Sequence, residues 1–141
     1  MPRAAYRLMM PDAVTTPVVV ASPHSGRHYP WHFMRRSVLD DRSVRSSEDA
    51  FMDQLVAAAP DLGAPLLAAE YPRAYIDLNR ASDELDPAVV EGVRYPAQNP
   101  RISSGLGVIP RVVANGRGIY RGKITRDEAD ERIEAVWKPY H

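Results

Sequence analysis

Cysteine is absent from the 141 residues, which excludes both disulfide bonds and thiolate metal sites. Long apolar segments are absent too, because no run approaches the ~20 apolar residues that a membrane-spanning helix requires. The first ten residues carry Arg3 and Arg7 and lack the apolar stretch of a secretory signal peptide. We therefore expect a soluble, cytoplasmic protein with no membrane partner.

The chain also has no excess of charge of either sign. Lys+Arg and Asp+Glu number 18 each, and the basic residues never run together as they do in a nucleic-acid-binding patch. We therefore expect no nucleic-acid partner. Hydrophobic residues make up 45% of the chain, which is ordinary for a globular protein, and the length fits one domain over residues 1–141.

The most informative segment is residues 16–26, TPVVVASPHSG, in which a β-branched run stops at Pro23 and is followed by His24. Open α/β sheets bind ligands and metals just past the carboxyl ends of their strands. Neutral imidazole serves there as a metal ligand or a general base. The alternative is a histidine that only hydrogen-bonds its own turn.

Two more histidines follow at spacings of four residues, His28 and His32. That spacing would place all three on one face of a helix, but Pro23, Gly26 and Pro30 disfavour a helix through them. We therefore expect His28 and His32 to be loop residues and not zinc ligands.

Two adjacent acids, Glu48 and Asp49, form the second candidate group. Zinc hydrolases often combine two histidines with one carboxylate, so either acid is a candidate metal ligand. The alternative is capping, since acids near the start of a helix interact favourably with its dipole.

Basic and amide side chains form the third group. Asn79 and Arg80 end a predicted strand, at the sheet edge where His24 is expected, Arg73 directly precedes that strand, and Arg111 lies near a predicted turn. Guanidinium groups bind carboxylates in a bidentate manner, so these residues predict a small acidic substrate. The alternatives are surface ion pairs for Arg73 and Arg80 and solvated hairpin charges for Arg111.

The hydrophobic pattern predicts an α/β fold with a mixed central sheet flanked by helices. Residues 28–45 are expected to be irregular, and residues 82–100 to form a long excursion with at most a short helix near 87–91. Strands are predicted at 18–21, where the apolar run indicates cover on both faces, and at 65–69 and 74–78, with a turn at 115–118 between 112–113 and 119–120. A helix is predicted from 46 or 47 to 59, with an apolar stripe of Phe51, Leu55 and Ala59. A helix capped by Thr125 is predicted at 125–140, with an apolar stripe of Ala129, Ile133, Val136 and Tyr140.

Short motifs follow one another along nearly the whole chain, at residues 22–26 (SPHSG), 29–30 (YP), 47–53 (SEDAFMD), 71–80 (YPRAYIDLNR), 84–87 (ELDP), 107–111 (GVIPR), 119–120 (IY) and 139–141 (PYH). In this order they resemble the motifs of the N-formylglutamate amidohydrolases.

This resemblance implies a zinc carboxypeptidase-like fold and zinc-dependent hydrolysis of N-formyl-L-glutamate, or a similar N-acyl amino acid, to formate and glutamate in histidine breakdown. It implies His24 as the first zinc ligand and Asp49 as the acidic ligand, with Glu48 as the alternative. Arg73 would contact the substrate or the oxyanion, as a catalytic residue. Asn79 and Arg80 would hold the substrate's carboxylate, and arginines such as Arg111 would assist.

One departure from the family pattern matters. The family continues for roughly as long again, with an Asp-x-His-Ser motif whose histidine looks like another zinc ligand, and this chain has no such motif. We therefore expect a truncated, incomplete domain that is inactive or weakly active alone. The alternatives are a non-catalytic module that binds small carboxylates and a fragment that self-associates through an open sheet edge. The oligomeric state stays open, with a homo-oligomer among the possibilities.

Overall fold

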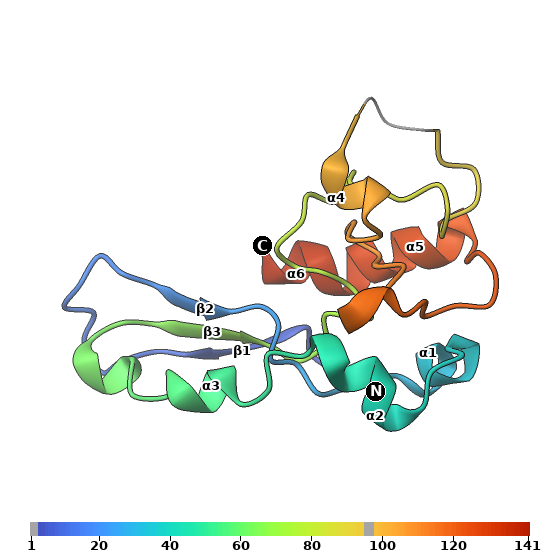
Figure 1. The fold of residues 1–141 in the computed structure, drawn as a ribbon. Coiled ribbons are helices and arrows are strands. Elements are labelled where there is room, and N and C mark those ends of the chain that lie inside the picture. The colour runs from blue at the N-terminus through green and yellow to red at the C-terminus, as the bar shows by residue number, and fades with distance from the viewer. Residues whose placement is uncertain (1–2, 95–97) are drawn as a thin grey trace.

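A three-stranded mixed sheet forms one end of the molecule (Figure 1). The computed structural model describes residues 3–94 and 98–141. Strand β3 (Leu66–Ala69) lies in the middle, antiparallel to β1 (Tyr6–Met9) and parallel to β2 (Val20–Ser22). The predicted mixed sheet flanked by helices is confirmed. β1 was not expected, because its four residues include Arg7 and form no continuous apolar run.

The helices are short, and most of them surround the body of the molecule beyond the sheet (Figure 1). They are α1 (Trp31–Arg36), α2 (Asp41–Val44), α3 (Met52–Leu55), α4 (Pro100–Ser103), α5 (Arg126–Arg132) and α6 (Lys138–Tyr140), with a π-helical turn at Ile133–Trp137 and 3-10 turns at Arg45–Ser47, Pro60–Leu62 and Ala114–Gly116.

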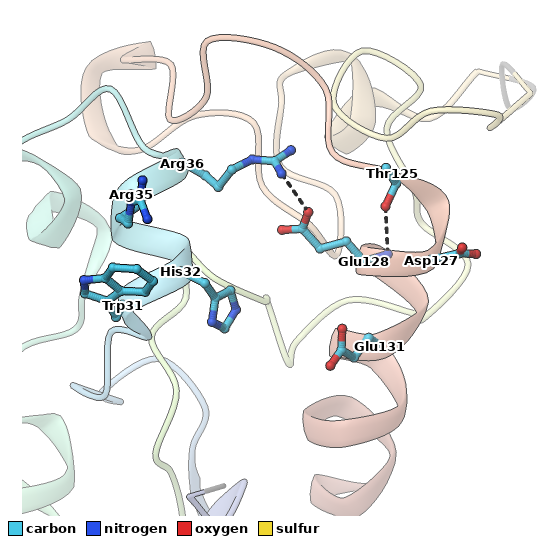
Figure 2. Close-up of a pocket in the computed structure, with 8 residues that line it drawn as sticks. All are labelled: Trp31, His32, Arg35, Arg36, Thr125, Asp127, Glu128 and Glu131. Carbon is cyan, nitrogen blue, oxygen red and sulfur yellow. Dashed lines mark hydrogen bonds and ion pairs between the residues drawn. The ribbon is translucent and has the colours of Figure 1, made fainter.

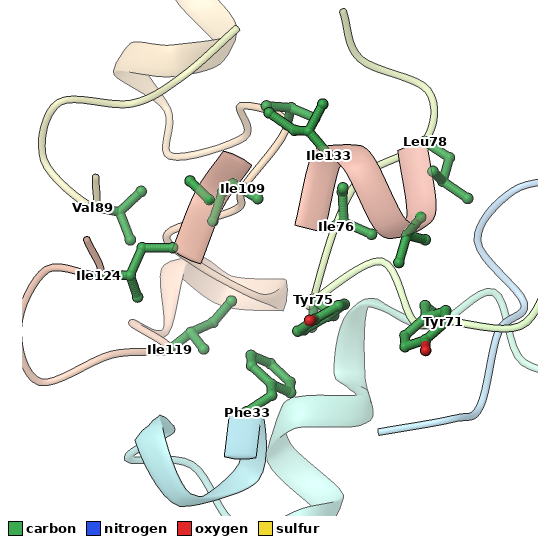
Figure 3. Close-up of a cluster of buried hydrophobic side chains, with 14 of the residues drawn as sticks. Phe33, Tyr71, Tyr75, Ile76, Leu78, Val89, Ile109, Ile119, Ile124 and Ile133 are labelled. Carbon is green, nitrogen blue, oxygen red and sulfur yellow. The ribbon is translucent and has the colours of Figure 1, made fainter. Parts of the chain in front are cut away.

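The main core lies between α1, the 71–78 segment and the C-terminal helix. Figure 3 shows Phe33 rising from α1 toward Tyr75 and Ile119, all three of them buried. Arg132 is also buried there, with its guanidinium 4.2 Å from the Tyr75 ring centroid. It donates hydrogen bonds to the Tyr75 carbonyl at 3.0 Å and to the Tyr120 hydroxyl at 2.7 Å. A buried charge is tolerated where an opposite charge pairs with it, and Arg132 Nη2 lies 2.7 Å from Glu128 Oε1. Arg132 therefore links the last helix to the middle of the chain.

The last helix is the best-predicted element. The Thr125 side chain accepts a hydrogen bond from the Glu128 backbone N–H, as the capping sequence predicts, and α5, the π-helical turn and α6 run on to Tyr140. The predicted apolar stripe is entirely buried; its members are Ala129, Ile133, Val136 and Tyr140.

The predicted helix from 46 or 47 to 59 is wrong. Phe51 has a φ of 64°, a left-handed conformation that does not occur within an α-helix. Between Phe51 and residue 59, α3 is the one α-helical stretch. The Asp49 N–H is bonded to the His24 carbonyl at 2.9 Å and takes no part in a helical cap. Phe51 and Leu55 of the predicted stripe are exposed, whereas Ala59 is buried. Tertiary contact with the His24 turn outweighs the local pattern.

Two predicted strands need correction. Residues 74–78 are buried but form no strand: the first two belong to a turn in which the Tyr75 N–H donates to the Pro72 carbonyl, and irregular backbone follows. The strand predicted at 18–21 begins only at Val20, and Val18 and Val19 are exposed rather than covered on both faces. The strand predicted at 65–69 is confirmed as β3.

The segments expected to be irregular hold more helix than predicted. Residues 28–45 contain α1 and α2. The 82–100 excursion ends at Pro100, which is the first residue of α4, and the Asn99 side chain caps this helix. Near 87–91 there are turns and one bridge between Val90 and Ile124. Residues 95–97 of the excursion lie outside the described residues. The turn at 115–118 is present and carries a single bridge, from Val112 to Gly118.

Among the residues that the structure describes, no helix has both the length and the apolar character needed to cross a membrane.

Candidate metal and substrate site

His24 lies in a tight turn directly after β2, as the sequence predicts, and its side chain is buried. The hydroxyl groups of Ser22 and Ser25, 2.6 Å apart, brace the turn from inside. Gly26 lets the turn pass against the 70–71 backbone, because a Cβ at this position would lie 2.0 Å from the Tyr71 carbonyl oxygen. The turn therefore holds the imidazole in a fixed position.

Asp77 fixes one side of the His24 ring. Its buried carboxylate lies 2.7 Å from His24 Nε2, and it also accepts hydrogen bonds from Arg73 Nε at 3.1 Å and from the Asn79 backbone N–H at 2.9 Å. Burial would raise the pKa of Asp77. The bond and charge of His24, the Asn79 N–H and the Arg73 charge outweigh this effect and hold the pKa below its ordinary value. Asp77 is therefore an anion, and because a carboxylate only accepts, it accepts the hydrogen bond from His24 Nε2.

Asp49 lies on the opposite side of the same ring. Its Oδ2 is 3.5 Å from His24 Nδ1, and its side chain is half exposed. Glu48 is occupied elsewhere, since its Oε2 accepts hydrogen bonds from the Tyr29 hydroxyl at 2.7 Å and from Arg45 at 3.2 Å. Burial, and then the bond to Glu48, raise the pKa of Tyr29, so the phenol remains a donor. The geometry therefore favours Asp49 over Glu48 as the partner of His24.

A cavity of about 480 Å³ opens beside this group. Asp49, Glu48 and Arg73 line one part of it, and the loop from Leu106 to Gly116 lines another. Arg73 thus reaches both the buried Asp77 carboxylate and the cavity. A basic side chain, Arg73, and an acidic one, Asp49, therefore line the same opening, and Asp49 also contacts the fixed His24 imidazole.

The other predicted substrate residues lie farther from this opening. Arg80 donates to the carbonyls of Leu106 and Asn79, and Asn79 itself is exposed and contacts Asp77 through its backbone N–H. Arg111 is paired with the buried Asp86 carboxylate at 2.9 Å. None of Asn79, Arg80 and Arg111 is among the residues that line the cavity. Their role in substrate binding stays a prediction.

A second, larger cavity of about 580 Å³ lies between α1 and α5. Figure 2 shows Trp31, His32, Arg35 and Arg36 on one wall facing Glu128 and Glu131 on the other, with an ion pair of 3.3 Å between Arg36 and Glu128. His32 lies in α1, so the expectation that it is a loop residue is wrong, and its Nε2 is 3.2 Å from the Tyr75 hydroxyl. His28 lies outside any helix or strand, as expected. The predicted site residues do not line this cavity, and the Arg36–Glu128 ion pair crosses it.

Comparisons with known proteins agree with these motifs. The family model for N-formylglutamate amidohydrolase matches residues 16–141. The chain belongs to this family. It is 28% identical over 127 residues to an N-formylglutamate deformylase of Pseudomonas putida and 29% identical over 129 residues to that of Pseudomonas aeruginosa, covering 89% of this chain in both cases.

A crystal structure of the N-formylglutamate amidohydrolase from Ralstonia eutropha JMP134 is 38% identical and superposes with a TM-score of 0.88. The alignment covers 99% of this chain but 50% of that protein, and 42% of each Pseudomonas relative. The chain therefore spans about half the length of the N-formylglutamate amidohydrolases and deformylases that it matches.

The sequence analysis assigns no role in the site to Asp77, whereas the structure buries it against His24. The available signal was an acid inside the apolar stretch from Ala74 to Leu78, since carboxylates are almost never fully buried without partners. His141, at the end of the last helix, is held by two contacts. Its ring packs on Trp137 with centroids 4.2 Å apart, and its Nε2 lies 2.9 Å from the Leu78 carbonyl oxygen.

Proposed function

We propose that this chain carries one part of the active site of a zinc-dependent hydrolase that cleaves the formyl amide of an N-formyl amino acid. The observation that supports this proposal best is the position of His24 between Asp77 and Asp49. A histidine that ligates zinc typically donates its other N–H to a carboxylate, which sets the tautomer and increases ligand basicity. Asp77 on Nε2 leaves Nδ1 directed toward Asp49.

The separation of these two groups fits a shared zinc ion. Zinc bonds to nitrogen and oxygen of about 2.0–2.1 Å at a tetrahedral angle place two donor atoms about 3.4 Å apart. His24 Nδ1 and Asp49 Oδ2 are 3.5 Å apart without rearrangement. His24 and Asp49 would therefore hold the metal, with Glu48 kept away by Tyr29.

The chemistry that zinc supplies when bound is Lewis acidity, which polarises an amide carbonyl and activates water. The residues of this chain do the positioning. Arg73 has five N–H donors, and its Nε is committed to Asp77, so the remaining donors are available to an anionic group of the substrate in the cavity. Asp77 aligns His24 and Arg73 together, because one carboxylate contacts both.

The metal site is incomplete within the residues that the structure describes. Catalytic zinc has three protein ligands, and no group of three histidine or acidic side chains in residues 3–94 and 98–141 is arranged to hold a metal. We propose that a further ligand comes from polypeptide outside these 141 residues, and that the chain alone binds zinc weakly and hydrolyses little substrate. N-formylglutamate, which the names of the relatives give, is the first substrate to try.

The test compares two neighbouring acids. Zinc affinity and formate release from N-formyl-L-glutamate are measured for wild type, Asp49→Asn and the matched control Glu48→Gln. We expect Asp49→Asn to weaken zinc binding and Glu48→Gln to leave it close to wild type. Equal zinc affinity in all three proteins would overturn the ligand assignment. Fast formate release by wild type would overturn the proposed dependence on further polypeptide.

A further inference from the structure

Three arginines line a cavity of about 330 Å³ that shares no lining residue with the cavity beside Asp49. They come from separate segments: Arg3 precedes β1, Arg7 lies in β1, and Arg27 follows the turn that carries His24. The residues that line this cavity are Arg3, Arg7, Ser25, Arg27, His28, Ala69 and Glu70. The fold therefore brings three positive charges together from parts of the chain that are not neighbours in sequence.

Two buried carboxylates hold these guanidinium groups in place. Glu70 Oε2 lies 2.7 Å from Arg3 Nε, and Glu70 Oε1 lies 2.5 Å from Arg7 Nε. Asp53, which does not line the cavity, places its Oδ2 2.8 Å from Arg7 Nη2 and 3.1 Å from Arg27 Nη2. Because these ion pairs already orient the arginines, a bound anion would order few additional side chains, and preorganisation of this kind favours binding.

Positive charge exceeds negative charge in this group. Three guanidinium groups face two carboxylates, which leaves an excess of one positive charge. His28 also lines the cavity. Burial and the charge of Arg3 lower its pKa, and the charge of Glu70 opposes them with a smaller effect. The imidazole is therefore neutral at physiological pH and leaves this excess unchanged.

Each arginine keeps N–H groups that the ion pairs do not use. Within residues 3–94 and 98–141, the side chain of Arg3 bonds through Nε, that of Arg27 through Nη2, and that of Arg7 through Nε and Nη2. A guanidinium group has five N–H donors, so every one of the three has donors left over. A carboxylate presents its two oxygens in one plane, whereas a tetrahedral oxyanion presents oxygens in several directions. Donors from three segments therefore suit the tetrahedral group better.

We propose that this cavity binds a doubly charged tetrahedral oxyanion, either phosphate or the phosphoryl group of a small phosphate ester, between Arg3, Arg7 and Arg27. The proposed hydrolase function uses none of these residues, so the two proposals stand or fall separately. The competing explanation is an ion-pair network that only stabilises the fold. That network would lose stability when an arginine is removed, but its stability would not depend on the anion.

Isothermal titration calorimetry on the metal-free protein tests this proposal, because an anion cannot then bind through zinc. The titrants are inorganic phosphate, glycerol 3-phosphate and acetate, at about pH 8, where the phosphates are doubly charged, and at low ionic strength. We expect both phosphates to bind at one site per chain and acetate to bind at least about tenfold more weakly. The tighter of the two phosphates identifies the source, a free ion or an ester. Absence of phosphate binding, or acetate binding as tight as phosphate, would overturn the inference.

Two variants ask whether the arginines of the cavity are responsible. Arg3→Gln and Arg27→Gln each remove one cation, and each should weaken phosphate binding at least about tenfold. Arg101→Gln is the matched control, because Arg101 is as exposed as Arg3 and is also paired with one carboxylate, Glu84, but does not line the cavity. It should bind phosphate as wild type does. Unchanged affinity in both cavity variants, or equal weakening in all three variants, would overturn the inference.

Urea unfolding with and without phosphate separates loss of the anion site from loss of stability. A ligand that binds the folded state raises the midpoint of unfolding, so phosphate should raise it in wild type and in Arg101→Gln. The rise should disappear in Arg27→Gln, even if that variant is less stable without phosphate. A rise in Arg27→Gln equal to that of wild type would support the purely structural network and overturn the inference.

Discussion

Replacing Asp77 with asparagine tests whether this buried carboxylate holds the site together. The substitution keeps the shape of the side chain and removes its charge. Asparagine can still accept through Oδ1 from His24 and the Asn79 N–H, but its amide group would face the Arg73 Nε–H. Two donors would then oppose each other where an ion pair stands in the wild type.

The expected loss of stability follows from these contacts. Hydrogen bonds to charged groups contribute about 1.5–3 kcal/mol each, and removing one partner of a buried pair costs about 3–5 kcal/mol. Because the substituted amide retains two of the three acceptor contacts, we expect the free energy of unfolding to fall by about 2–4 kcal/mol. Loss of a carboxylate behind a metal-ligating histidine typically weakens metal affinity about 10–100-fold, so zinc binding should weaken in proportion.

Urea unfolding followed by circular dichroism measures the stability. Asp83 is exposed, so the control Asp83→Asn should unfold at the same urea concentration as wild type. The pH dependence gives a second readout. Since the pKa of Asp77 is lowered in the folded state, its stabilisation is present above the unfolded pKa and is lost as the pH falls through the folded pKa. Wild type should thus lose stability below about pH 4, and Asp77→Asn should lose less there. A variant as stable as wild type at pH 7 would refute this account of the site.

Two further substitutions test the turn that carries His24 and the cap of the last helix. Gly26→Ala places a Cβ 2.0 Å from the Tyr71 carbonyl oxygen, so we expect the free energy of unfolding to fall by about 2–3 kcal/mol and zinc binding to weaken. The control Gly122→Ala, which has open space around its Cβ, should leave both quantities unchanged. Thr125→Ala removes the cap of α5, so the free energy of unfolding should fall by about 1 kcal/mol while the zinc affinity stays unchanged. Thr125→Ser keeps the hydroxyl and should restore the wild-type midpoint of urea unfolding.

The sequence was informative where a local pattern and the tertiary fold agree. The helix from Thr125 to Tyr140 has both a cap and an apolar stripe, and the structure contains both. The turn after β2 that carries His24 was predicted from a β-branched run followed by proline and glycine, and the structure has it. In both segments the local conformational preference of the residues agrees with the structure that packing against the core requires.

The predictions failed where contacts between distant segments decide the local structure. Phe51 adopts a left-handed conformation beside Asp49, whose backbone is bonded to the His24 carbonyl, and no periodicity within residues 46–59 reveals that bond. The 74–78 segment reads as a strand because it is buried, yet the Asp77 N–H pairs with the Val108 carbonyl outside any sheet. The partnership of Asp77 and His24 spans 53 residues, so spacing along the sequence does not indicate it.

The most direct test of the proposed metal centre is a zinc titration of the metal-free protein against a competing chelator dye, in wild type, His24→Ala and the control His28→Ala. The account predicts a single weak site per chain that His24→Ala abolishes and His28→Ala retains. Identical titration curves for wild type and His24→Ala, or no zinc binding by wild type, would contradict it.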